Sequence, residues 1–209
     1  MKIDMNSTRI QKARLFCMVA HAAVAQKRKY TGEPYHIHPF EVADRVALVP
    51  GATEDMVIAA LLHDVVEDTR RFLDENGNVV KEPSKHLRAG GKLTLEEGIT
   101  LDLIEQEFGS NVRRLVAGLT DVAMPWDGNR DKRMGMNRDH TAEQAGDVQT
   151  VKLADVDNNI RNIAVNDPDF APKYLSEKRD LLNVLKDGDP ELYDSVKTFI
   201  REFYAARRA

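Results

Sequence analysis

Apolar residues recur every three or four positions along most of the chain, which is the spacing of an amphipathic α-helix. Near the N-terminus they run from Ile10 to Ala23 behind a predicted N-cap at Ser7 or Thr8. Pro39 is placed to occupy the first turn of a second helix, which ends at the Pro50-Gly51 stop. The pattern predicts a mainly helical protein.

A third predicted helix begins at the capping residue Thr53 and carries an unbroken apolar run from Val57 to Leu62. A helix that is apolar on all sides belongs in a protein core. Helical spacing resumes at Thr94 or Thr100. Further helices are predicted at about residues 112–122, 143–166, 171–187 and 190–207.

Two segments interrupt the helical pattern. Residues 70–94 begin with a stretch that resembles a small hairpin around the Asn76-Gly77 turn. Residues 123–140 are polar and contain one proline and two glycines, which predicts an irregular segment. We therefore expect an all-α bundle with a small β-hairpin-like insertion. Residues 1–209 should form one domain, with the helices of residues 171–209 packed on it.

Composition narrows the class of protein. Of the 209 residues, 42% are hydrophobic and 31% are charged, as in an ordinary globular domain. No apolar run approaches the roughly 18 residues of a membrane span, and the N-terminus lacks an apolar signal core. Cys17 is the only cysteine, so no internal disulfide forms, and a net charge of −4 disfavours a large nucleic-acid-binding face. We expect a cytoplasmic protein.

Residues 61–69 hold the most informative chemistry of the chain. His63 and Asp64 offer one imidazole and one carboxylate to a divalent metal, and Glu67 and Asp68 follow one helical turn later. On a continuous helix Glu67 would lie beneath His63, and Asp68 beneath Asp64. Four ionisable groups at the end of a buried helix are costly unless something pairs with them, and a metal ion would do so.

Two further residues complete a candidate metal site. His38 precedes Pro39 at the start of the second predicted helix, and Asp155 lies in a helical stretch far downstream. The resulting pattern H…HD…D combines two imidazoles with two carboxylates, which suits Mn²⁺, Fe²⁺ or Zn²⁺ better than Ca²⁺. Because the spacers vary, this pattern alone is a weak indicator of function.

The segments around the pattern make it more specific. In chain order they are Arg28-Lys29, Gly32-Glu33-Pro34-Tyr35, His38-Pro39, Ala60 through Thr69, Phe108-Gly109, Leu115-Val116, Leu119-Thr120 and Lys152-Leu153-Ala154-Asp155. Together they closely resemble the hydrolase domain of the RelA/SpoT family, within the HD-domain phosphohydrolase superfamily. The resemblance covers roughly residues 10–165. No synthetase domain follows, so the chain resembles a stand-alone small alarmone hydrolase.

This resemblance implies an HD-type helical bundle that binds one Mn²⁺ and removes the 3′-diphosphate of ppGpp or pppGpp as pyrophosphate. Carried over position by position, it implies metal ligation by His38, His63, Asp64 and Asp155, water activation by Glu67 and Asp68, and nucleotide contacts from Arg28, Lys29 and Asn159. Lys152 and Arg161 are further cations able to neutralise substrate phosphates.

One departure from the family affects the expected substrate. After Asp155 the family usually continues with a basic residue, whereas this chain has Val156 followed by Asp157. If Asp157 faces the pocket, its charge disfavours a highly anionic substrate. Two alternatives therefore stay open: hydrolysis of another phosphorylated nucleotide or of NADPH, and a nucleotide-sensing or partner-binding module without turnover.

Three other residues carry weaker signals. His21 lies on the first predicted helix, where a histidine is more often buried or at the surface than a metal ligand. Tyr35 is placed either to stack on a base or to pack. Trp126 lies in the polar segment, either as a substrate cover or as a packing anchor. The sequence does not reveal the oligomeric state.

Overall fold

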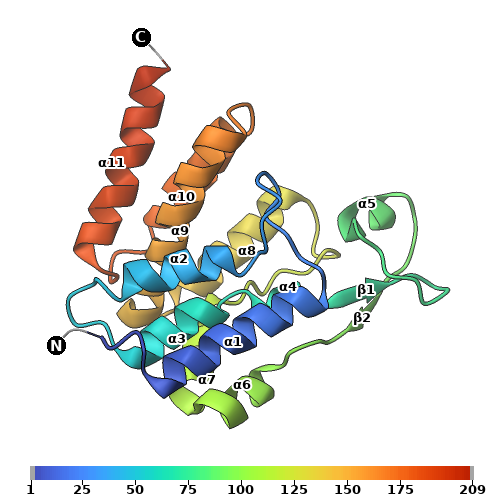
Figure 1. The fold of residues 1–209 in the computed structure, drawn as a ribbon. Helices are drawn as coiled ribbons and strands as arrows, with labels where there is room; N and C mark the ends of the chain where they lie inside the picture. Colours follow the sequence, from blue (N-terminus) through green and yellow to red (C-terminus); the bar gives the residue numbers. More distant parts are fainter. Residues whose placement is uncertain (1–2, 208–209) are drawn as a thin grey trace.

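The computed structural model describes residues 3–207, and helices dominate it (Figure 1). The helices are α1 (Thr8–Ala23), α2 (Ile37–Val46), α3 (Glu54–Leu62), α4 (Val65–Asp68), α5 (Pro83–Arg88), α6 (Leu101–Phe108), α7 (Ser110–Leu119), α8 (Arg130–Ala142), α9 (Gly146–Asn166), α10 (Ala171–Leu182) and α11 (Pro190–Ala206). Within the described residues, β1 (Arg71–Leu73) and β2 (Thr94–Glu96) form one two-stranded sheet. The predicted all-α class is confirmed.

Helix α3 is the centre of the molecule. The Thr53 side chain caps it by accepting a hydrogen bond from the backbone N–H of Met56, as predicted. Every residue from Met56 to Leu62 is buried. Helices α1, α2, α7 and α9 all pack against α3, so its apolar sides are covered in every direction.

Helix α9 joins two hydrophobic clusters. Val151 and Ala154 belong to the cluster around α3, whereas Leu153, Val156 and Ile160 belong to a second cluster with α10 and α11. The C-terminal helices therefore pack on α9, where they stand above the rest of the bundle in Figure 1. That residues 1–209 form one domain stays a prediction, and residues 1–2 and 208–209 lie outside the described part.

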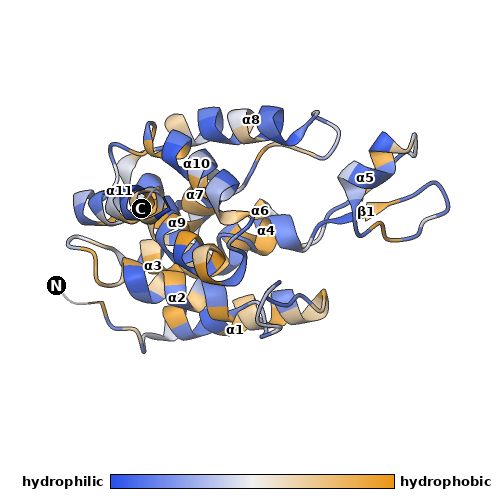
Figure 2. Ribbon diagram, turned by 90° about the horizontal axis from the view of Figure 1, so that it is seen from above, coloured by the Kyte–Doolittle hydropathy of each residue, from blue (hydrophilic) through white to orange (hydrophobic). Residues whose placement is uncertain are grey.

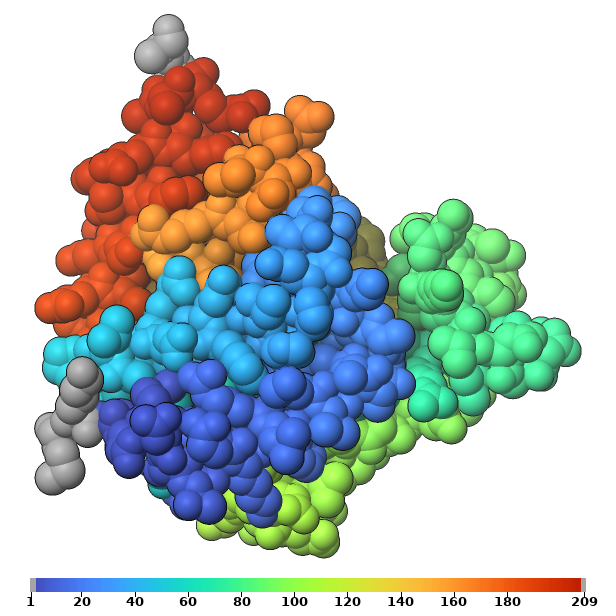
Figure 3. All heavy atoms as spheres, in the orientation of Figure 1, coloured from blue at the N-terminus to red at the C-terminus, as the bar shows by residue number. Residues whose placement is uncertain are grey.

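The insertion differs in detail from the predicted hairpin. The chain does turn at Gly77, but the three-residue ladder of β1 is with β2, and residue 79 makes only an isolated bridge to Leu73. Helix α5 lies between the strands in sequence, and the whole segment projects from the body of the protein (Figure 3). At its base, Thr69 Oγ1 accepts a hydrogen bond from the backbone N–H of Ile99 at 2.8 Å. The insertion thus leaves the bundle and returns to it at one point, directly after α4.

The prediction of an irregular segment at residues 123–140 was wrong for its second half. Helix α8 begins after Asn129, whose side chain caps it, and only Thr141 on this helix is buried. It is largely hydrophilic (Figure 2), so it has too few apolar positions to show helical periodicity. Of the two predicted resumption points, Thr100 caps α6, whereas Thr94 lies in β2. Across residues 3–207 we find no helix with the length and apolar character of a membrane span.

Candidate metal centre

Three separate parts of the chain bring the predicted metal ligands together. His38 lies in the first turn of α2, His63 and Asp64 lie at the junction of α3 and α4, and Asp155 lies on α9. Because α2 and α9 both pack on α3, the fold itself places these residues at one point.

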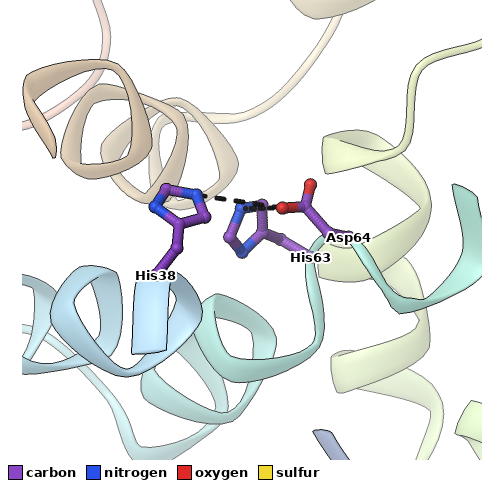
Figure 4. A group of neighbouring side chains, drawn as sticks. All are labelled: His38, His63 and Asp64. Carbon is purple, nitrogen blue, oxygen red and sulfur yellow. Dashed lines mark ion pairs between the residues drawn. The ribbon is translucent and has the colours of Figure 1, made fainter. Parts of the chain in front are cut away.

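The distances within the cluster suit a shared metal ion. Ligand atoms of His38, His63 and Asp64 all lie within 4.8 Å of one another (Figure 4). His63 Nε2 lies 3.1 Å from Asp64 Oδ2, and His38 Nε2 lies 3.8 Å from the same oxygen. Asp155 is outside this tightest group, yet its Oδ1 lies 3.1 Å from His38 Nε2 and 3.7 Å from His63 Nε2.

Hydrogen bonds on the far side of each imidazole fix which nitrogen faces the cluster. His63 Nδ1 lies 2.7 Å from the carbonyl oxygen of Ala60, so Nδ1 donates and, in the neutral ring that binds a metal, Nε2 carries the lone pair. His38 Nδ1 lies 2.9 Å from Asn158 Oδ1, whose amide donates to Glu41 at 2.8 Å. Both Nε2 atoms are buried and have no hydrogen-bond partner within the described chain. This arrangement of ligand and outer partner is the one found for metal-bound histidines, so the residues fit a divalent metal.

The carboxylates of the cluster are held in the ionised form. Burial would raise the pKa of Asp64, but His63 and His38 outweigh it and keep that pKa below its ordinary value. For Asp155, burial is outweighed by the same two histidines and by Lys152, which hold the pKa well below its usual range. The Tyr35 hydroxyl also donates to Asp64 Oδ2 at 2.7 Å. Deprotonated carboxylates are the form in which aspartate binds metals.

The two candidate water-activating acids point to different neighbours. The sequence predicted one continuous helix through this segment, but the structure has two, because α3 ends at Leu62 and α4 begins only at Val65. Glu67 accepts a hydrogen bond from the backbone N–H of Asp121, whereas Asp68 Oδ2 accepts one from Gln26 Nε2 at 2.8 Å. Among residues 3–207, neither acid has a cation as its hydrogen-bond partner.

Burial and nearby negative charge make both acids reluctant to ionise. Burial, then the charges of Asp121 and Asp64, raise the pKa of Glu67 to about 8. Burial and Asp64 raise the pKa of Asp68 to about 7. Acids with pKa values near neutrality are suited to accept and return a proton. A divalent cation in the cluster would lower both values, because it favours the charged form.

Four of the five predicted substrate-binding residues divide into two groups. Asn159 and Lys152 lie at the cluster: Asn159 donates to Asp155 Oδ1 at 2.6 Å, and Lys152 Nζ lies 3.7 Å from Asp155 Oδ2. Arg28 and Lys29 lie on the turn between α1 and α2. Arg28 Nη1 is 3.2 Å from Glu41 Oε2, and the exposed Lys29 contacts Asp167.

Arg161 lies apart from the cluster in this structure. Its guanidinium donates to Asp157 Oδ1 at 2.9 Å and to Ser195 Oγ at 3.0 Å. Arg45 Nε is a second cation beside Asp157, at 3.3 Å from Oδ2. Asp157 therefore joins α9 to α2 and α11, while Asp155 faces the other candidate metal ligands. Residues two apart on a helix are expected to point in different directions.

A cavity of about 320 Å³ lies beside Lys152, between α8, α9 and α10. Its other lining cations are Arg130, Arg138 and Lys178. Arg130 makes a two-pronged contact with Glu177, whereas Arg138 and Lys178 have no ion-pair partner among residues 3–207. Burial and the charge of Lys152 lower the pKa of Lys178. An anionic group in this cavity would relieve the repulsion between the two lysines.

Sequence reasoning missed several residues that support the site. Asn158 orients His38, Gln26 holds Asp68, and Asp121 provides the N–H group that binds Glu67. Tyr35 contacts Asp64 directly. Trp126 packs edge-on against Phe72 of the insertion, with ring centroids 6.0 Å apart. No local pattern marks Asn158, Gln26 or Asp121, because each acts across a tertiary contact, whereas Tyr35 and Trp126 were candidates whose roles the sequence left open.

The fold and this site define a helical, metal-binding domain. The sequence matches the HD-domain family over residues 16–185, and the chain belongs to that family. Domains of this family bind divalent metals through histidine and aspartate clusters of the kind found here. The resemblance inferred from the sequence motifs is confirmed.

Known proteins similar to this chain fall into long and short groups. A guanosine-3′,5′-bis(diphosphate) 3′-pyrophosphohydrolase of Aquifex aeolicus is 29% identical over 92% of this chain but only 26% of its own length. The mouse (Mus musculus) enzyme of the same name, MESH1, is 32% identical over 76% of this chain and 73% of its own length. This chain therefore spans about a quarter of the Aquifex relative and most of the mouse one.

A solved structure of a metazoan SpoT ortholog, described as hydrolysing ppGpp, shares the fold. It superposes with a TM-score of 0.72, at 20% identity, over 96% of this chain and 98% of the other. At this level of identity the likeness establishes the fold.

Proposed function

We propose that this protein is a metal-dependent hydrolase that removes the 3′-diphosphate of guanosine alarmones, converting ppGpp or pppGpp to GDP or GTP plus pyrophosphate. The observation that carries the proposal is the convergence of the free Nε2 atoms of His38 and His63 on Asp64 and Asp155. It is supported by the named activity of the mouse relative, which this chain matches over 73% of that protein's length.

His38, His63, Asp64 and Asp155 would hold one divalent metal, which we propose to be Mn²⁺, with Fe²⁺ and Zn²⁺ as the competitors. When bound, such a metal polarises a phosphoryl oxygen and lowers the pKa of a water molecule. Glu67 and Asp68 divide two tasks, so that one carboxylate orients the attacking water and the other accepts its proton, a contribution of roughly 10²–10⁴ in rate. The carboxylate that takes this proton then returns it to the departing nucleotide oxygen.

Positively charged side chains from two parts of the chain would bind the phosphates. Lys152 lies between the cluster and the cavity. Burial lowers its pKa, but the charges of Asp121, Asp155 and Glu67 have the larger opposite effect, so the pKa is raised overall and the ammonium stays charged. Arg28 and Lys29, on the turn between α1 and α2, would contact the guanine base and a phosphate. Asn159 adds a polar contact, and Arg161 keeps a proposed but more distant role.

The geometry removes the reason for preferring a less anionic substrate. Asp157 is paired with Arg45 and Arg161 rather than facing the metal cluster. Its charge is therefore compensated within the fold. Another phosphorylated nucleotide or NADPH remains the alternative substrate to be tested, and a non-catalytic nucleotide-binding role is the alternative of a different class.

One assay separates these functions. The purified, metal-free protein is incubated with ppGpp, GTP or NADPH, with and without Mn²⁺, and pyrophosphate and phosphate are measured separately. Alarmone hydrolysis predicts Mn²⁺-dependent release of pyrophosphate from ppGpp, whereas hydrolysis of NADPH would release phosphate. A protein that binds ppGpp but leaves it intact overnight would be the non-catalytic module, and the proposal would be wrong. Asp64→Ala is the control for a contaminating hydrolase.

We further propose that the partner is a small nucleotide rather than a nucleic acid or a membrane, and that the protein acts in the cytoplasm. The support comes from its net charge of −4 and its single cysteine. Whether it forms an oligomer is open to measurement by light scattering.

A further inference from the structure

A chain of two hydrogen bonds connects Asp68 to the C-terminal end of α1. Gln26 Nε2 donates to Asp68 Oδ2 at 2.8 Å, and His21 Nδ1 lies 2.7 Å from Gln26 Oε1. His21 is 1% exposed, so this chain runs from the protein interior to the acid.

The ionised form of Asp68 sets the direction of both hydrogen bonds. A carboxylate only accepts, so the NH₂ group of Gln26 must face Asp68 and its carbonyl must face His21. His21 Nδ1 then carries the proton and donates it to Gln26 Oε1. The remaining nitrogen, His21 Nε2, is buried with no partner within residues 3–207, which leaves the ring this one polar contact.

The backbone around Gln26 is shaped to bring its side chain to Asp68. Ala25 has φ = 52°, in the left-handed region that residues other than glycine rarely adopt. The next N–H, of Gln26, donates to the His21 carbonyl at 3.0 Å. Strained residues of this kind persist where the surrounding structure requires them, often at functional sites.

The same group of residues also reaches the metal cluster. The ring of Tyr35 packs on the ring of His21, with centroids 4.8 Å apart, and its hydroxyl donates to Asp64. Asp68 and a proposed metal ligand are thus held by one connected set of side chains. Asp68 Oδ1 receives no hydrogen bond from the described residues, so it is the oxygen left to accept a proton.

We propose that His21 and Gln26 are positioning residues for hydrolysis: His21 orients the Gln26 amide, and this amide holds Asp68 Oδ2 so that Oδ1 is presented to the water. The inference rests on the proposed function, because it assigns a role in the reaction of that site. A packing role alone would require neither the donor of Gln26 nor that of His21.

The direct test is Gln26→Met, which preserves the length of the side chain and removes the donor. We expect kcat for ppGpp to fall by about tenfold or more, with KM changed less than about threefold, because the loss is confined to the transition state. Mn²⁺ affinity should be unchanged. Gln106→Met, on the exposed face of α6, is the matched control and should match the wild-type protein in every measurement.

Two further comparisons separate positioning from folding. On an Asp68→Asn background, Gln26→Met should lower kcat no further, because residues that act as a unit are not additive. His21→Asn keeps a donor near the Nδ1 position and should retain most of the activity. His21→Phe keeps the ring against Tyr35 but loses the donor, and it should lose kcat as Gln26→Met does.

The proposed function and the positioning role would fail with different experimental results. If the wild-type protein releases no pyrophosphate from ppGpp, the proposed function is wrong. If it is active but Gln26→Met changes only the melting temperature, or lowers kcat equally with and without Asp68→Asn, the positioning role is wrong. If Gln26→Met fails to fold, the comparison of His21→Asn with His21→Phe decides the question, and equal kcat values for these two would overturn the proposal.

Discussion

At the scale of single residues, the site separates side chains that can hold a metal from side chains that can move a proton. His63 and Asp64 contact each other and the rest of the cluster, whereas Glu67 turns away to the backbone of Asp121. The two kinds of residue therefore differ in their hydrogen-bond partners: the candidate ligands contact one another, and Glu67 contacts the backbone. This difference makes the two kinds of residue separable by mutation.

We predict that Asp64→Ala abolishes metal binding and activity, whereas Glu67→Gln retains the metal and lowers kcat by about 10²-fold or more. Removing Asp64 takes away one of the four carboxylate and imidazole ligands, while the change at Glu67 leaves all four in place. Metal content by atomic absorption, measured beside kcat, tests both statements. Loss of metal from both variants would show that Glu67 is itself a ligand.

The raised pKa of Glu67 predicts how the stability of the metal-free protein depends on pH. Its ordinary value is 4.5, and burial with Asp121 and Asp64 raises it to about 8 against the opposing charge of Lys152. A pKa that is higher in the folded state favours the fold below pH 4.5, and this contribution is lost as pH rises through 8.

Glu67→Gln should therefore stabilise the metal-free protein relative to wild type increasingly as pH rises from about 5 to about 9, by up to about 5 kcal/mol at the upper end. Urea unfolding at each pH, with a chelator present, measures the difference between the two proteins. A difference that is the same at all pH values would show that Glu67 ionises normally.

How far the site could be predicted depends on whether a residue belongs to a local motif. His63, Asp64, Glu67 and Asp68 lie in one short segment, so the sequence alone indicated their chemistry. Asn158 could not be found in this way, because its role depends on the packing of α9 against α2. A local motif therefore indicates the candidate ligands, whereas the residues that orient those ligands become visible only in the folded structure.

At the scale of elements, α9 has different tasks on different faces. Asp155 points into the metal cluster, whereas Asp157, two residues later, bridges to Arg45 on α2 and to Ser195 on α11. The family resemblance predicted Asp155 as the metal ligand, but the sequence left open whether Asp157 also faces the pocket.

We predict that Asp157→Ala destabilises the protein by about 1–3 kcal/mol while metal binding and kcat stay within about twofold of wild type. The loss follows because Arg45, Arg161 and Ser195 lose a shared acceptor that is largely buried. Thermal unfolding and ppGpp hydrolysis are measured together. Glu202→Ala, on the exposed side of α11, is the control; a large fall in kcat at unchanged stability would instead place Asp157 in the reaction.

The elements themselves were predictable where burial produces periodicity. Helices α1 and α3 begin at the expected caps, Ser7 and Thr53, because each buries a regular set of apolar residues. Helix α8 and strand β2 were missed, since α8 buries almost nothing and β2 pairs with a strand about 20 residues away. Short, exposed or non-local elements leave little trace in a single sequence.

At the scale of the whole molecule, the candidate metal ligands lie where three separate segments of the chain meet. Helices α2 and α9 and the α3–α4 junction each provide at least one of them, and α9 also carries the second hydrophobic cluster with α10 and α11. A metal bound there would link segments 117 residues apart, from His38 to Asp155. Binding to the folded state alone stabilises a protein by mass action.

We therefore predict that Mn²⁺ at about 100 times its dissociation constant raises the unfolding free energy by about 2.7 kcal/mol, and that a chelator reverses this gain. The gain should shrink as pH falls: burial lowers the pKa of His63, but Asp64 and Asp155 outweigh it and raise that pKa well above its ordinary value, so a proton competes with the metal for this imidazole. Scanning calorimetry with and without Mn²⁺ at several pH values measures this gain.

Two aspartate variants on α9 test whether the metal joins this helix to the rest of the fold. Asp155→Asn should lose most of the stability gain from Mn²⁺, whereas Asp157→Ala should retain it. A gain that is equal in both variants would mean that the metal binds without joining α9 to the rest of the fold.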